Sequence, residues 1–196
     1  MSEQLPEVVS NPLVEFCREC ITRYANKWPP TESDLAMDFA FKFDVLPLLT
    51  IEQIETLCFH LGIKVSFRTL APELAGHNCS YENDDLIELN NKEIVFGGMT
   101  HTLFHEIREI MERYFIGLQY PAMNENEREL RADLFAGAVR TYCIYKIIGY
   151  LADGIADISS DLVRWGAYAL LFAGVFAHGA ACILLPQQED YISKYR

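Results

Sequence analysis

The sequence predicts an α+β fold, in which helices cover a small sheet of about three strands. In several long stretches apolar residues recur at three- and four-residue steps, which is typical of amphipathic helices. A shorter central part alternates apolar and polar residues, which is typical of half-buried strands. The chain has 196 residues, 51% of them hydrophobic, which is enough for one domain with a substantial core.

The first quarter of the chain is predicted to be mainly helical. After a polar tail, apolar residues from position 11 onward share one helical face, and two consecutive prolines stop this helix. Residues 31–48 are apolar but alternate only in part, so the pattern leaves their structure open. Thr50 and Gln53 have the spacing of a capping box, which predicts that the next helix begins here.

Three short strands are predicted to follow this helix. Residues 63–67 alternate Ile, Val and Phe with polar side chains. Residues 86–89 and 93–96 indicate two more strands, with Asn90-Asn91 suited to a tight turn between them. The stretch 72–78 is expected to be a loop.

A central amphipathic helix is predicted from Thr100 to Phe115. His101, His105 and Glu109 are spaced by four, so they lie one turn above one another on the same helical face. Glu106 lies beside them. The apolar positions that define the opposite face are Leu103, Phe104, Ile107, Ile110, Met111, Tyr114 and Phe115.

This pattern is close to that of a metal site built on a single helix. Two ligands at positions i and i+4, with a carboxylate next to the first, provide both metal ligands and a general base. The usual sequence is His-Glu-x-x-His, and here the fifth position holds Glu109.

A second site helix is predicted to start near Asn124, which can cap it. Glu129 and Asp133 are one turn apart on this helix. Its predicted apolar face consists of Leu130, Leu134, Phe135, Val139, Tyr142 and Cys143.

Together the two helices predict a metal site with nitrogen and oxygen ligands. His105, Glu109 and Glu129 would be the three protein ligands, and a fourth position would stay open for water, as in catalytic zinc sites. Glu106 would accept the proton of that water. Asp133 would orient a ligand through a hydrogen bond.

The residue at position 109 leaves three alternatives open. Glu109 could bind zinc itself, or favour a harder metal such as manganese or iron. The ligands could instead be His101, His105 and Glu129. The metal could also be absent, with the fold kept as a binding module.

Without a metal, the three glutamates of this site would repel one another. One of them must then be protonated or paired with a nearby cation. Arg108 and Arg131 are the candidates that the sequence offers.

The motifs resemble those of the ImmA/IrrE family of zinc metallopeptidases. The resemblance covers about residues 35–140 and rests on three segments: Thr102-Leu103-Phe104-His105-Glu106, Glu129-Leu130-Arg131-Ala132-Asp133-Leu134-Phe135-Ala136, and the helix and strand from Ile51 to Phe67. It implies a zincin-like, gluzincin-like arrangement with zinc bound by His105 and Glu129 and with Glu106 as general base. It also implies a peptidase that cuts a protein partner, often a repressor of transcription.

The expected organisation has three parts. Residues 1–30 form a tail and a helix, residues 31–145 the zincin-like domain, and residues 146–196 apolar helices packed on that domain. Residues 165–186 carry no formal charge. We expect them to form a buried helix or a homo-oligomer interface, with a membrane span as the less favoured alternative.

Charge and cysteine content narrow the class of protein. A net charge of −12 argues against nucleic acid as the main partner, because phosphate binding needs clustered Lys and Arg. The six cysteines are irregularly spaced and the N-terminus lacks an apolar signal region, so a cytoplasmic chain with reduced thiols is expected. Cys17 and Cys20 are expected to be two small residues on a helix.

The predicted function is therefore a metal-dependent peptidase that acts on a protein or peptide partner. The competing hypothesis is a catalytically inactive relative that serves as a binding or regulatory module.

Overall fold

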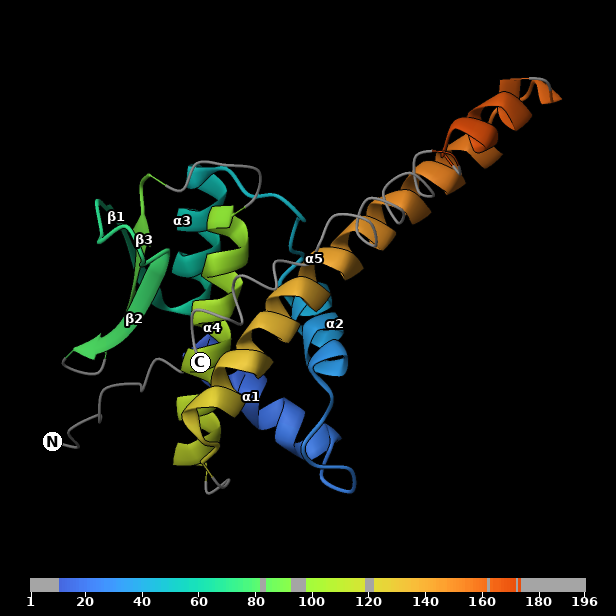
Figure 1. Ribbon diagram of the computed structural model, residues 1–196. Helices are drawn as coiled ribbons and strands as arrows, with labels where there is room; N and C mark the ends of the chain where they lie inside the picture. The colour runs from blue at the N-terminus through green and yellow to red at the C-terminus, as the bar shows by residue number, and fades with distance from the viewer. Residues whose placement is uncertain are drawn as a thin grey trace, which may run out of the picture. The chain divides into compact units, whose positions relative to one another are not determined.

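The computed structural model describes residues 11–81, 84–92, 98–118, 122–161, 163–171 and 173. The chain is α+β, as predicted (Figure 1). It divides into two compact units, Met1–Ile144 and Tyr145–Arg196, and the boundary between them falls inside the long helix Glu125–Ala156. The elements in order are α1 (Pro12–Arg23), α2 (Glu32–Lys42), α3 (Ile51–Leu61), β1 (Ile63–Arg68), β2 (Gly76–Tyr81), β3 (Asp84–Asn90), α4 (Gly98–Gly117) and α5 (Glu125–Ala156).

The three strands form one mixed sheet with the order β1-β3-β2. β3 pairs in parallel with β1 and antiparallel with β2. The predicted strands at 63–67 and 86–89 are confirmed. The loop prediction for 72–78 is wrong over residues 76–78, which belong to β2, because hydrogen bonds to β3 order a polar segment that has no apolar alternation. The strand predicted at 93–96 lies outside the described residues.

Capping side chains fix the starts of the first three helices. Asn11 accepts hydrogen bonds from the first turn of α1. The predicted capping box of Thr50 and Gln53 is present at the start of α3. A second capping box, formed by Thr31 and Asp34, begins α2, so the part of the open stretch from Glu32 to Lys42 is helical.

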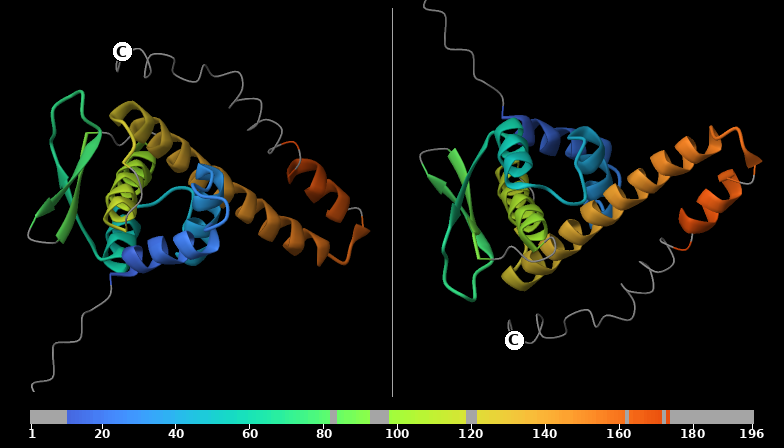
Figure 2. Two further views of the ribbon diagram at one scale, coloured as in Figure 1. Left: turned by 90° about the horizontal axis from the view of Figure 1, so that it is seen from below. Right: turned by 90° about the horizontal axis from the view of Figure 1, so that it is seen from above.

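Helix α4 forms the centre of the first unit. Figures 1 and 2 show it between the sheet on one side and α1 and α2 on the other. Its predicted apolar face is buried, apart from Tyr114, which is half-buried. The rings of Phe39 and Phe104 lie 6.2 Å apart and those of Phe39 and Phe135 lie 5.6 Å apart, so α2, α4 and α5 share one aromatic cluster.

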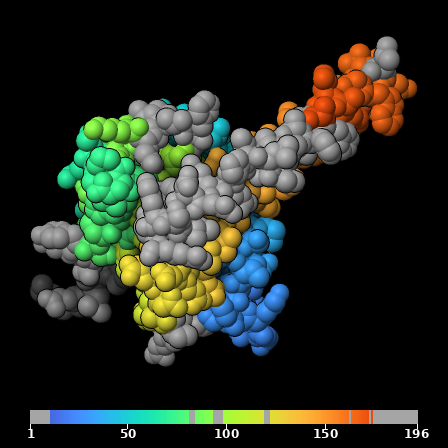
Figure 3. Space-filling view, viewed as in Figure 1, coloured from blue at the N-terminus to red at the C-terminus, as the bar shows by residue number. Residues whose placement is uncertain are grey.

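Helix α5 buries only part of the predicted apolar face: Phe135, Val139 and Cys143 are buried as predicted. Leu130 and Leu134 are 56% and 54% exposed, so their assignment to the core is wrong. The small side chains of Ala132 and Ala136, which the sequence pattern does not assign to the buried face, are buried in addition. Figure 3 shows the first turns of α5, in yellow, at the surface of the molecule.

A buried ion network joins α2, α4 and α5. Arg108 is 3% exposed, and its Nε and Nη2 donate to the two carboxylate oxygens of Glu32 at 2.8 and 3.0 Å. Nη1 of Arg108 donates to Glu112 at 3.1 Å. Arg131 of α5 reaches the same Glu32 at 3.5 Å and Glu127 at 3.1 Å. Arg108 and Arg131, the cations offered for the site's glutamates, are therefore engaged elsewhere.

The second unit contains the rest of α5 and a helical segment over residues 163–171. The hydroxyl of Tyr168 donates to the carbonyl of Ala152 at 3.2 Å. Most of the predicted helix at 165–186 lies outside the described residues. Within the part of the chain that the structure describes, no helix has the length and apolar character needed to cross a membrane.

We expect Arg108→Met to lower the free energy of unfolding by about 3–5 kcal/mol, because it removes the buried cation that pairs with Glu112 and leaves Glu32 only the longer contact with Arg131. Urea denaturation followed by circular dichroism measures this. Arg23→Met is the control: Arg23 is 58% exposed and its partner Asp38 keeps the hydrogen bond from Tyr24, so its loss should cost less than about 1 kcal/mol. Equal losses in the two variants would contradict a stabilising role for the buried network.

Candidate metal centre

Helices α4 and α5 bring together three of the residues that the sequence singled out. His105, Glu109 and Glu129 each offer one ligand atom, and these atoms lie within 4.8 Å of one another. Ligand atoms around a single zinc ion are about 3–4 Å apart, so a small movement of half-buried side chains would close the group around a cation. One imidazole and two carboxylates form a donor set that suits zinc, manganese or iron.

His105 contacts a carboxylate through each ring nitrogen. Its Nδ1 is 2.8 Å from Asp133 and its Nε2 is 3.3 Å from Glu129. Burial lowers the pKa of His105, but the bonds with Asp133 and Glu129 outweigh burial and raise the pKa to about 10. The imidazole is therefore protonated at neutral pH in the metal-free chain. Asp133 contacts Nδ1, which is the position from which a carboxylate can orient the ring.

The contacts of the two acids on α5 agree with this charge state. The hydrogen bond with His105 lowers the pKa of Glu129. Burial raises the pKa of Asp133, but hydrogen bonds with His101 and His105 lower it well below its usual range. His101 lies 3.5 Å from Asp133, and among the described residues the group close enough to share a cation includes Glu109 rather than His101.

Glu106, the candidate base, is held beside Glu109 by one amide. Nδ2 of Asn78 donates to Glu106 at 2.5 Å and to Glu109 at 2.7 Å. Glu106 is 6% exposed, and burial raises its pKa although the bond from Asn78 lowers it. The sequence does not single out Asn78, because this residue lies on β2, where no local pattern predicts a strand.

Arg128 is a second residue of this group that the sequence motifs do not single out. Its Nε donates to Glu109 at 2.9 Å, and its Nη2 lies 3.8 Å from Glu129. Its position in the sequence could have indicated a contact with an acid. It precedes Glu129 near the start of a helix, where the helix dipole disfavours a positive charge unless an acid compensates it.

A polar network fixes Asn78 from the side of the sheet. Its Oδ1 accepts a hydrogen bond from Arg113, which also donates to Asp85 of β3 at 2.7 Å. Ser80 donates to Asp85 at 2.7 Å and Tyr114 donates to its other oxygen. The sheet and α4 therefore hold the amide in one orientation, with its NH₂ toward the two glutamates.

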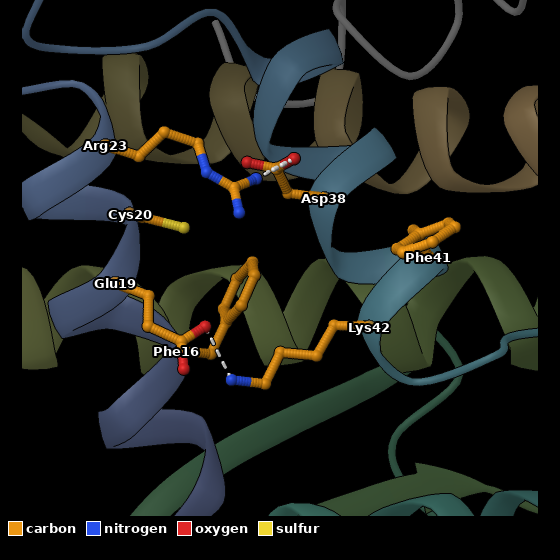
Figure 4. A pocket seen from close by; sticks show the side chains of 7 residues that line it. All are labelled: Phe16, Glu19, Cys20, Arg23, Asp38, Phe41 and Lys42. Atoms are coloured by element: carbon orange, nitrogen blue, oxygen red, sulfur yellow. Dashed lines mark hydrogen bonds and ion pairs between the residues drawn. The ribbon is translucent and has the colours of Figure 1, made fainter.

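A hollow of about 300 Å³ lies between α1 and α2, away from this group (Figure 4). Its charged side chains pair with one another: Arg23 with Asp38, and Lys42 with Glu19 at 2.6 Å. Burial raises the pKa of Cys20 to about 12, so its thiol is protonated at neutral pH. These lining residues offer neither an uncompensated charge nor a thiolate. The group on α4 and α5 is therefore the stronger candidate for a functional site.

No family model matches the chain, and no curated protein or solved structure matches it either. The geometry of the α4–α5 group therefore carries the functional argument.

The high pKa of His105 predicts a pH-dependent stability of the metal-free protein. Because the pKa rises from 6.5 to about 10 on folding, the stabilisation is fully present below pH 6.5 and is lost as the pH rises through 10. His105→Gln should remove this loss, which amounts to roughly 1.4 kcal/mol per unit of pKa difference. Urea denaturation between pH 6 and pH 10.5 with a chelator measures it.

His60→Gln is the matched control, because His60 is an exposed histidine on α3 outside this cluster. Its profile should follow that of the wild type. A His105→Gln profile that also followed the wild type would contradict the paired, protonated state of His105.

Proposed function

We propose that the chain is a metal-dependent peptidase that hydrolyses a peptide bond in a protein partner. The observation that carries this proposal is the grouping of His105, Glu109 and Glu129, with one ligand atom of each within 4.8 Å of the others. The zincin-like arrangement implied by the ImmA/IrrE resemblance is part of the same proposal. Zinc is the proposed cofactor, and manganese or iron would suit the two carboxylates.

When bound, a divalent cation at this group supplies Lewis-acid chemistry, since it polarises a carbonyl and lowers the pKa of water. Glu106 has the environment of a general base beside it. Asn78 donates to its Oε2, so the proton taken from water would go to Oε1. The raised pKa makes Glu106 a stronger base than an ordinary glutamate, and the proton would then pass to the leaving amine.

Asp133 would set the orientation of the imidazole ligand. Its carboxylate accepts from Nδ1 of His105, so Nε2 points toward Glu129. Once the Nε2 proton is released, the nitrogen that faces the other ligands can bind a cation.

A second candidate function is a catalytically inactive binding or regulatory module. Both oxygens of Glu109 already accept hydrogen bonds, from Asn78 and from Arg128. Both nitrogens of His105 contact carboxylates. The group is therefore compensated by the chain itself, which favours a fold that stands without a cation.

Elemental analysis of protein purified without a chelating tag separates the two candidates. The peptidase should contain about one zinc, manganese or iron ion per chain, and His105→Ala should lose it. Glu106→Gln should keep the metal and lower kcat toward an unfolded protein substrate by about 10²–10⁴-fold, because it removes the base but no ligand.

Glu127→Gln is the matched control for both readouts. Glu127 lies in the first turn of α5 and pairs with Arg131, outside the ligand group. It should retain metal content and activity. If no metal binds after incubation with each of the three ions, the peptidase proposal is wrong and the binding module remains.

A further inference from the structure

The guanidinium of Arg128 lies between two of the candidate ligands. Its Nε donates to Oε1 of Glu109 at 2.9 Å, and its Nη2 is 3.8 Å from Oε1 of Glu129. These are carboxylates from different helices, so a single positive charge compensates both. The third candidate ligand, His105, contacts the other oxygen of Glu129 at 3.3 Å.

The local structure of α5 does not by itself favour this arginine. Asn124 accepts hydrogen bonds from the backbone N–H groups of Glu127 and Arg128, which places Arg128 close to the start of the helix. A positive charge is unfavourable at that end because the helix dipole is also positive there. The acids of the site must therefore supply the attraction that holds the side chain.

The two donors to Glu109 differ in how readily they can leave. Asn78 is neutral and is fixed by its bond from Arg113, so it can stay on Oε2 when a cation arrives. Arg128 is 41% exposed and can turn into water. Because two positive charges a few ångströms apart repel strongly in a half-buried site, a divalent cation and the guanidinium cannot share this group.

We propose that Arg128 is an internal counter-ion which a divalent cation must displace, and that Arg128 thereby sets the affinity of this site for the cation. This inference rests on the proposed function, since it assumes that His105, Glu109 and Glu129 bind a cation. It assigns Arg128 a role opposite to that of a ligand or base: it stabilises the metal-free site and weakens binding.

Zinc titration of the full-length, metal-stripped chain against a chromophoric chelator tests this. Arg128→Gln should bind Zn²⁺ about 10-fold more tightly than the wild type, because the competing charge is gone. Arg128→Lys keeps a mobile charge and should stay near the wild type. Arg23→Gln removes the same charge from an exposed position on α1 and should leave the affinity unchanged.

The midpoint of thermal unfolding gives a readout that does not depend on activity. With a chelator, Arg128→Gln should unfold at a lower temperature than the wild type, because the glutamates lose their counter-ion. With saturating Zn²⁺, its midpoint should equal or exceed that of the wild type. A merely structural arginine would lower both midpoints, and that result would overturn the inference.

The two proposals can fail separately. If the wild type and Arg128→Gln bind Zn²⁺ with equal affinity, the counter-ion role is overturned and the metal site stands. If neither binds Zn²⁺, Mn²⁺ or Fe²⁺, both proposals are overturned.

Discussion

The carboxylate of Glu32 connects α4 and α5, because arginines from both helices contact it. It receives Arg108 of α4 through two hydrogen bonds and Arg131 of α5 at 3.5 Å. Apolar packing of the neighbouring phenylalanines tolerates small shifts, whereas a forked guanidinium–carboxylate pair is directional. Arg108 lies one turn after His105, and Arg131 lies two residues after Glu129. A shift of α4 that separated the ligands would therefore disturb the pair of Arg108 with Glu32, and a shift of α5 would disturb the contact of Arg131 with Glu32.

The candidate site is acidic, and the chain compensates it from two sides. On the sheet side the neutral amide of Asn78 joins Glu106 to Glu109. On the side of α5 the charged Arg128 reaches Glu109 and Glu129. One donor is fixed by a hydrogen-bond network and the other is partly exposed. A cation bound as proposed would therefore meet one donor that is fixed in place and one that can turn into water.

The parts of this fold that the sequence predicted are those determined by local pattern. The face of α4 and the spacing of His105 and Glu109 follow from helical periodicity alone. The error on α5 concerns Leu130 and Leu134. Hydrophobic pattern alone assigns these large side chains to the core, whereas the buried face also includes the small side chains of Ala132 and Ala136. Asn78 could not be predicted, because its strand is ordered by pairing with β3 rather than by its own residues.

Glu109 has as many acceptor oxygens as it has hydrogen-bond donors around it. A carboxylate has two oxygens, and here one accepts from Asn78 and the other from Arg128. A neutral imidazole has one acceptor nitrogen, so a histidine at this position would leave one of the two donors without its partner. Glu109 is therefore matched to its surroundings on β2 and α5, and the departure from His-Glu-x-x-His is compensated by residues far away in the sequence.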